Sequence, residues 1–241
     1  MTIETSVLAT KLNTFVRLSD GESRCLAQLQ SSSIEVARGA EFVHQGETGN
    51  VAYILQSGWA CSSKLLPDGG RQVITFPIPG DCVGLRSILL RTADHSVAAV
   101  TDSIVSRIQI SRILEVFNEF PHLATAILWA TSRDEAMVVE HLASVGRRTA
   151  IERTAHFFLE LYDQLTLIEM AQDGTFNCPL SQYELGDALG LSAIHVNRVL
   201  RMLREQGLMT FNAHTVTLHN IRGLKELAGY ETPEHAAVLV R

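Results

Sequence analysis

The stretch from residue 180 to residue 208, LSQYELGDALGLSAIHVNRVLRMLREQGL, decides how the C-terminal third of the chain folds. Ser181 and Glu184 have the spacing of a capping box, in which a hydroxyl and a carboxylate satisfy two free amides at the start of a helix. Gly190 can take the left-handed conformation that ends this helix, and Ser192 can cap the next one. The sequence therefore predicts two short helices joined by a tight turn.

The second of these helices is amphipathic. Between residues 192 and 204 there are three arginines and no acid, in a chain whose net charge is -6. A helix that reads DNA needs base-edge donors near its N-terminus and phosphate partners along its flank. This pattern favours DNA reading over an arginine face that is merely solvated. The apolar stripe on its other face has the spacing i, i+3, i+4, i+7 and consists of Val196, Val199, Leu200 and Leu203.

Side chains on the polar face suit base recognition. Arg198 can donate two hydrogen bonds to guanine, and Asn197 can do the same for adenine. After Gly207, the segment LMTFNAHTVTLHN predicts a β-hairpin centred on Asn212 and Ala213, a wing beside the two helices. Its polar residues could donate to phosphates.

The rest of the chain has a β-strand pattern first and a helical pattern after it. Residues 34–110 alternate apolar and polar residues between turn signals, which is typical of a sandwich or barrel. A short helix is expected from Ser111, and Pro121 opens a longer one that runs to about Gly146. This long helix either forms a dimer or covers the β domain, and its apolar stripe favours a dimer. The stripe comprises Leu128, Val138, Leu142 and Val145.

Another helix is expected to begin after Thr149, because Glu152 completes another capping box there. We place a domain boundary near Gly146, where the helical pattern is interrupted.

The composition narrows the functional class. The 241 residues are 46% hydrophobic and 19% charged, which is typical of a soluble globular protein, and the net charge argues against nonspecific coating of nucleic acid. No signal peptide and no membrane-spanning run are recognisable, so a cytoplasmic protein is expected. No nucleophile–base constellation or phosphate loop indicates an enzyme. Four scattered cysteines lack metal-ligand spacing, and no cofactor is expected.

A β-rich domain, a long helix, a hinge and a winged helix-turn-helix together resemble the Crp/Fnr superfamily of bacterial transcription regulators. The resemblance spans nearly the whole chain and is strongest in LGDALGLSAIHVNRVLRMLREQGL and GRRTAIERTAHFF. It implies an α+β protein that binds a palindromic DNA site as a homodimer and then recruits or hinders RNA polymerase. The implied domains are an antiparallel, jelly-roll-like β-roll (1–120), a dimerisation helix and hinge (121–147), a winged helix-turn-helix (148–230) and a tail (231–241).

The resemblance also implies roles for single residues. Arg198 falls on the family's base-reading arginine, and Asn197 falls on a neighbouring reading position. Ile194 stands where many members carry a glutamate that accepts from cytosine; isoleucine could instead pack on a thymine methyl, so the half-site should differ. Phosphate contacts are expected from Ser181, Gln182, Ser192, His195, Arg201, Asn212, His214 and Thr215.

The effector is not recognisable. Relatives that bind cyclic AMP hold its ribose with a glutamate and its phosphate with an arginine, but this chain has Leu85 and His95 at those places. Val138 and Val139 replace the hydroxyl pair that the long helix offers to the nucleotide. An anionic phosphate needs a fixed cation to offset its desolvation, so the sequence argues against cyclic AMP.

Other means of control stay open. The oxygen-sensing branch uses an N-terminal cysteine cluster, and here only Cys25 is present. Cys178 is the first choice for redox control, because an adduct there would collide with nearby DNA phosphate. A regulator without a ligand is an equal alternative, and so is a β-roll that binds haem or senses redox state while its helical tail contacts another protein. Candidate axial haem ligands, without a spacing signal, are His44, His95, His122 and His141.

Overall fold

The computed structural model describes residues 6–232, which form two compact units. One unit holds residues 6–71 and 75–135, and the other holds residues 72–74 and 136–232. The sequence-based domain boundaries stay a prediction, and most of the expected tail, residues 233–241, lies outside the described residues. No helix in the described range is long and apolar enough to cross a bilayer.

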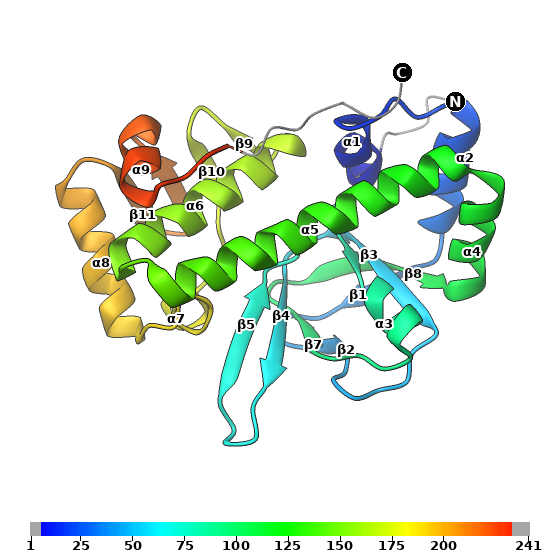
Figure 1. Cartoon of the computed structure of the whole chain (residues 1–241), viewed down its shortest axis with the longest axis horizontal. Coiled ribbons are helices and arrows are strands. Elements are labelled where there is room, and N and C mark those ends of the chain that lie inside the picture. The colour runs from blue at the N-terminus through cyan, green and yellow to red at the C-terminus, as the bar shows by residue number, and fades with distance from the viewer. Residues whose placement is uncertain (1–5, 233–241) are drawn as a thin grey trace. The chain divides into compact units, whose positions relative to one another are not determined.

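The first unit contains two four-stranded sheets with the orders β1-β8-β3-β6 and β2-β7-β4-β5 (Figure 1). Neighbouring strands pair antiparallel, as in β3 with β8 and β4 with β7. The N-terminal part is thus an antiparallel β-roll, and the chain as a whole has the expected α+β fold. The strands are β1 (Ser33–Val36), β2 (Glu41–Val43), β3 (Val51–Ser57), β4 (Ala60–Leu65), β5 (Arg71–Thr75), β6 (Cys82–Val83), β7 (Ser96–Ala99) and β8 (Ser103–Gln109).

Four short helices and one long helix accompany these sheets. A core cluster that includes Leu12, Leu26, Ile108 and Leu123 joins side chains of α1, α2, β8 and α5, and none of the four is more than 5% exposed. Burial of such apolar surface is the main stabilising contribution to the unit. The helices are α1 (Val7–Asn13), α2 (Asp20–Leu29), α3 (Leu85–Leu90), α4 (Ile110–Glu119) and α5 (Pro121–Arg147).

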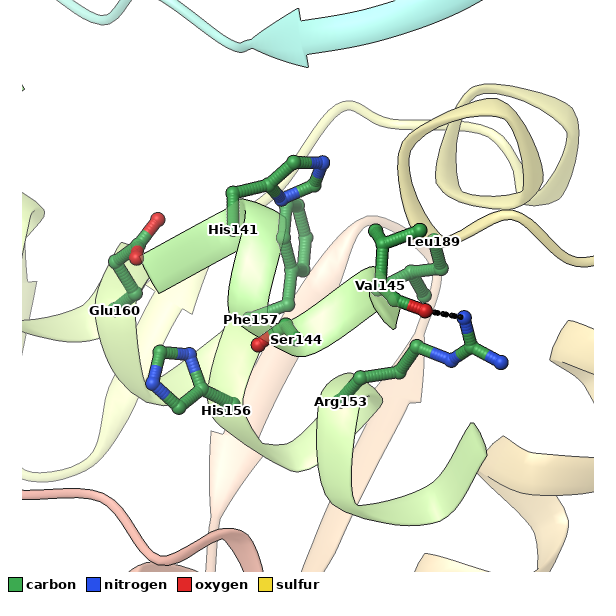
Figure 2. A pocket seen from close by; sticks show the side chains of 8 residues that line it. All are labelled: His141, Ser144, Val145, Arg153, His156, Phe157, Glu160 and Leu189. Atoms are coloured by element: carbon green, nitrogen blue, oxygen red, sulfur yellow. Dashed lines mark hydrogen bonds between the residues drawn. The ribbon is translucent and has the colours of Figure 1, made fainter. Parts of the chain in front are cut away.

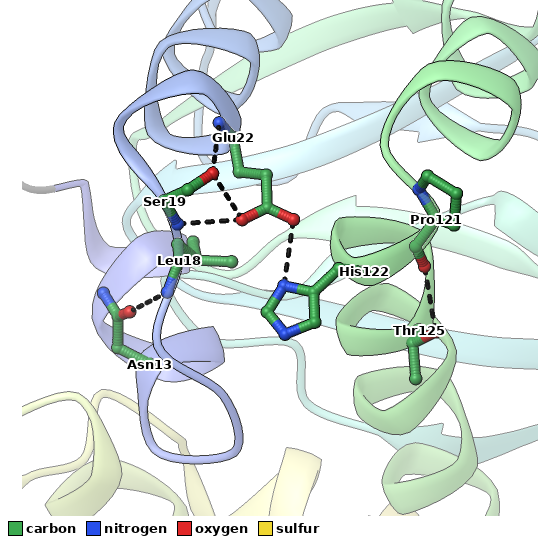
Figure 3. Close-up of polar contacts among 7 residues, drawn as sticks. All are labelled: Asn13, Leu18, Ser19, Glu22, Pro121, His122 and Thr125. Atoms are coloured by element: carbon green, nitrogen blue, oxygen red, sulfur yellow. Dashed lines mark hydrogen bonds and ion pairs between the residues drawn. The ribbon is translucent and has the colours of Figure 1, made fainter. Parts of the chain in front are cut away.

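A buried carboxylate connects the starts of α2 and α5 (Figure 3). Glu22 completes a capping box with Ser19, and its Oε1 lies 2.9 Å from Nδ1 of His122. Burial opposes the charge of Glu22, but the hydrogen bonds from Ser19 and His122 outweigh it and lower the pKa of the carboxyl. His122, one of the haem candidates, therefore has a structural partner.

A second buried polar cluster lies in the same unit. The Lys11 ammonium is 2.5 Å from the Asp81 carboxylate and 3.8 Å from that of Asp134. Burial opposes the charge of Lys11, yet the two carboxylates together raise its pKa. Helix α1 is thereby tied to the β-roll through the buried Asp81 and to the first half of α5 through Asp134, whose side chain is partly exposed.

The second unit surrounds α6 (Ala150–Leu167), which the predicted Thr149–Glu152 capping box begins. Helices α7 (Gln182–Leu189), α8 (Ala193–Glu205) and α9 (Ile221–Ala228) pack on it (Figure 1). Its small sheet has the order β11-β12-β10-β9. The strands are β9 (Ala171–Gln172), β10 (Thr175–Asn177), β11 (Met209–Asn212) and β12 (Thr215–Leu218).

Candidate nucleic-acid interface

Helices α7 and α8 begin and end where the sequence predicts. The Ser181 amide donates to the Glu184 carboxylate at 2.7 Å, and the Glu184 amide donates to the Ser181 hydroxyl at 3.2 Å. Gly190 ends α7 in the left-handed region, with φ 62° and ψ 41°. The Ser192 hydroxyl then accepts from the His195 amide at 3.2 Å and caps α8. Local side-chain chemistry therefore sets the angle at which the chain enters α8.

A close backbone approach holds the turn between these helices. The Leu191 amide donates to the Gly186 carbonyl at 2.9 Å, and a Cβ placed on Gly186 would lie only 2.6 Å from the Leu191 carbonyl oxygen. Any residue larger than glycine would push this turn away from α7. Sequence reasoning missed Gly186, although a glycine inside an otherwise regular amphipathic helix was a usable signal.

Gly186→Ala is expected to destabilise the second unit by about 1–3 kcal/mol, because the gain in helix propensity is smaller than the cost of overpacking against backbone. Both tryptophans, Trp59 and Trp129, lie in the first unit, so urea unfolding should be followed by far-UV circular dichroism. Gly49→Ala is the control, since no atom lies within 4 Å of its added Cβ. Equal midpoints for the two variants would contradict this explanation of Gly186.

Helix α8 has the two faces that its sequence predicts. Val196, Val199 and Leu203 are at most 2% exposed. Ile194, by contrast, is 85% exposed. Four polar or basic side chains of α8 are exposed too: Asn197, Arg198, Arg201 and Arg204. The three residues predicted to read bases, Ile194, Asn197 and Arg198, thus lie together on one solvent-facing surface.

Two hydrogen bonds link polar side chains on this surface. Arg198 Nη2 lies 3.1 Å from His195 Nε2, and Asn197 Nδ2 lies 3.4 Å from Gln182 Oε1 at the start of α7. Gln182, Asn197 and Arg198 are exposed, while His195 is half-buried. The exposed surface of α8 and the first turn of α7 therefore form one continuous polar area.

Tyr183 also belongs to this area and was missed in the sequence. It follows Gln182 on α7 and is 77% exposed. An aromatic residue opposite the buried Leu185 and Leu189 was the signal that could have found it.

The predicted wing is present, but its turn is one residue later than the sequence indicated. Strands β11 and β12 pair antiparallel, and the two turn residues are Ala213 and His214, with φ 45° and 63°. Two successive positive φ values are what a two-residue hairpin needs, and hydrophobic alternation alone does not locate them. Asn212, His214 and Thr215 are exposed around this turn.

The predicted dimerisation stripe on α5 is only partly exposed. Leu128 and Leu142 are 61% and 74% exposed, whereas Val138 and Val145 are half-buried. Val139, beside Val138, is 60% exposed. The positions that lie between Leu128 and Val139 on this side of the helix are polar, Ser132 and Glu135, so the apolar surface is interrupted. The residues through which α5 contacts a partner stay a prediction.

Val145 is half-buried and lines a small cavity in the second unit (Figure 2). The Arg153 guanidinium donates to the Val145 carbonyl at 3.4 Å. His141 lines the same cavity, and burial lowers its pKa despite a hydrogen bond with the backbone of Ala188. The cavity measures about 10 Å³, room for no more than one water molecule, so it is not a ligand site.

Cys178 does not have the environment of a redox-sensing thiol. It is fully buried, and burial raises its pKa to about 12. Because the thiolate is the reactive form, such a cysteine is inert. The sequence hypothesis rested on its nearness to Ser181 along the chain, and burial could not be read from that.

Cys178 is expected to resist iodoacetamide at pH 7.5 in the folded protein, with a thiolate fraction roughly three orders of magnitude below that of a free cysteine. Alkylation of this peptide, followed by mass spectrometry with and without urea, measures it. Modification as fast in the folded as in the unfolded protein would restore redox control as an explanation.

Charged side chains near the β-roll's α3 pair with one another. The Asp94 carboxylate contacts Arg86 and lies 2.7 Å from His95 Nδ1. Partial burial opposes the charge of Asp94, but these partners outweigh it and lower its pKa. His44, another haem candidate, is 2.7 Å from Glu41. Within residues 6–232, no three histidine, cysteine or acidic side chains are grouped closely enough to hold a metal.

Comparisons with known proteins agree with this architecture. Residues 33–120 match the model of the cyclic nucleotide-binding domain, and residues 152–227 match that of the Crp-like helix-turn-helix domain. The nitrogen fixation regulation protein FixK of Azorhizobium caulinodans is 31% identical over 193 residues, covering 79% of this chain and 77% of that protein. The transcriptional activator protein FnrA of Stutzerimonas stutzeri is 27% identical over 193 residues, which cover 80% of this chain and 78% of FnrA. The solved structure of FixK2 from Bradyrhizobium japonicum has a TM-score of 0.74 at 29% identity, covering 83% of this chain and 98% of FixK2.

Proposed function

The chain belongs to the Crp/Fnr family of transcription regulators, and from this premise we propose that it binds a palindromic DNA site as a homodimer. The observation that carries the proposal is the exposed surface of α8, where Ile194, Asn197 and Arg198 stand over a buried apolar stripe. A second helix of this kind fits the major groove and presents donors to base edges. The protein acts in the cytoplasm, without catalysis, and its bound dimer recruits or hinders RNA polymerase.

Each contact has a distinct task in this proposal. Arg198 reads guanine, Asn197 reads adenine, and Ile194 packs on a thymine methyl where many relatives accept from cytosine. Arg201 and the wing contact phosphates, which fix the register on the duplex. Tyr183 adds a hydroxyl donor at the edge of the groove. The half-site should therefore differ from that of relatives that carry the glutamate.

Cyclic AMP is not the effector in our proposal. The places that hold ribose and phosphate in cyclic-AMP-binding relatives carry Leu85 and His95, and His95 is engaged with Asp94. A carboxylate there would repel a phosphate rather than offset its charge. Added cyclic AMP should consequently leave the DNA affinity of the purified protein unchanged.

A fluorescence anisotropy titration in rising salt tests the main proposal. A dimer that neutralises several phosphates loses affinity steeply as salt increases, and a selected sequence competes far better than random DNA. A protein-interaction module with a β-roll would show neither behaviour. No salt slope and no sequence preference would refute DNA binding by α8.

A further inference from the structure

Two side chains that the sequence predicts to contact phosphate, those of His195 and Gln182, lie within hydrogen-bond distance of residues predicted to read bases. Arg198 Nη2 lies 3.1 Å from His195 Nε2, and Asn197 Nδ2 lies 3.4 Å from Gln182 Oε1. Arginine carries only donors, so in this contact Arg198 donates and His195 Nε2 accepts. Arg198 and Asn197, the two residues proposed to read bases, therefore each have a polar neighbour on the surface that would face DNA.

His195 is well placed to hold another side chain. Its own amide donates to the Ser192 hydroxyl, so its backbone is fixed in the first turn of α8, and the residue is half-buried. Arg198 is exposed and has a long, flexible stem. A flexible side chain loses conformational freedom when it is fixed on a base edge, and it loses less when it is already held.

Gln182 holds its partner across two helices. It occupies the first position of α7, whose start is fixed by the Ser181–Glu184 capping box, and it accepts from Asn197 on α8. The orientation of Asn197 thus depends on how α7 and α8 pack, which Gly186 controls through its close approach to Leu191.

We propose that His195 and Gln182 are positioning residues, which hold Arg198 and Asn197 in the orientation that reads bases and so set how sharply the protein discriminates there. This inference rests on the proposed function of α8. A phosphate contact strengthens binding to every sequence and contributes to the salt slope. A positioning residue instead strengthens binding only to sequences whose bases are contacted by the side chain that it holds.

The test uses the full-length protein and two fluorescein-labelled duplexes. One carries the sequence that the wild type selects from a random library, and the other differs at the base pair where Arg198→Ala loses discrimination. His195→Ala should lower the ratio of the two affinities about two- to tenfold, the effect of freeing one flexible side chain. Affinity for the altered duplex and the salt slope should not change.

Three further variants separate positioning from other roles. His195→Gln should restore the ratio, because its amide oxygen can accept from Arg198. His195→Ala should have no effect in the Arg198→Ala background, since the reader is then absent. Gln182→Ala should act in the same way at the base pair identified by Asn197→Ala. Far-UV circular dichroism confirms that each variant is folded.

Other results would overturn the inference. An unchanged ratio for His195→Ala would do so, and so would an equal loss on both duplexes with a shallower salt slope, which marks a phosphate contact. An undiminished loss in the Arg198→Ala background would also contradict positioning. Failure of the proposed function looks different, because the wild type would then enrich no sequence from the library.

Discussion

The double substitution Val139→Asp and Leu142→Asp is expected to leave the protein monomeric. It should lower the affinity for a palindromic site at least about 100-fold, since linked binding of two half-sites gains roughly 10²–10⁴ over one. These side chains are 60% and 74% exposed on α5, so the charges do not enter the core of the chain. In a dimer they would bring like charges together where apolar surface is buried.

Sedimentation velocity and DNA anisotropy measure the two parts of this prediction. Leu114→Asp is the matched control, because Leu114 is 57% exposed on a different helix, α4. It should leave the protein dimeric. A double variant that stays dimeric would place the subunit contact elsewhere, and a monomer of unchanged affinity would show that one copy suffices for binding.

Arg198→Ala is expected to remove the preference at one base pair in each half-site, which is worth about 1–3 kcal/mol per half-site. A palindrome contains two half-sites, so the binding free energy that the dimer loses is twice the loss per half-site. Binding to unrelated DNA should change little, because Arg198 donates to a base edge and not to phosphate in this account.

Arg201→Ala is the comparison on the same helix. Its guanidinium lies on the flank of α8, so its loss should weaken all sequences alike and make the salt slope shallower by about one. A panel of duplexes with every single substitution in the half-site distinguishes the two variants. If both weaken all duplexes equally, the role assigned to Arg198 is wrong.

Features encoded by neighbouring residues could be predicted from the sequence. The capping boxes at Thr149 and Ser181, the glycine that ends α7 and the apolar stripe of α8 each depend on residues within one or two turns. The roles of the α8 residues toward DNA remain predictions. They follow from which face is exposed, and that face is set by the same stripe.

Features that depend on distant contacts could not be predicted. Cys178 was proposed as a sensor because it precedes Ser181, yet packing buries it completely. The contact of Lys11 with Asp81 joins residues 70 positions apart. Periodicity places Val145 on the apolar stripe of α5, but only packing shows that this side chain lines a cavity.

Methylation interference at guanine N7 tests most directly whether α8 reads the major groove. In duplexes selected by the wild type, methylated guanines should block binding at two clusters about 10–10.5 base pairs apart, one in each half-site. Arg198→Ala should become indifferent to one guanine in each cluster. Interference that is absent from the major groove, or a pattern that Arg198→Ala leaves unchanged, would contradict the account.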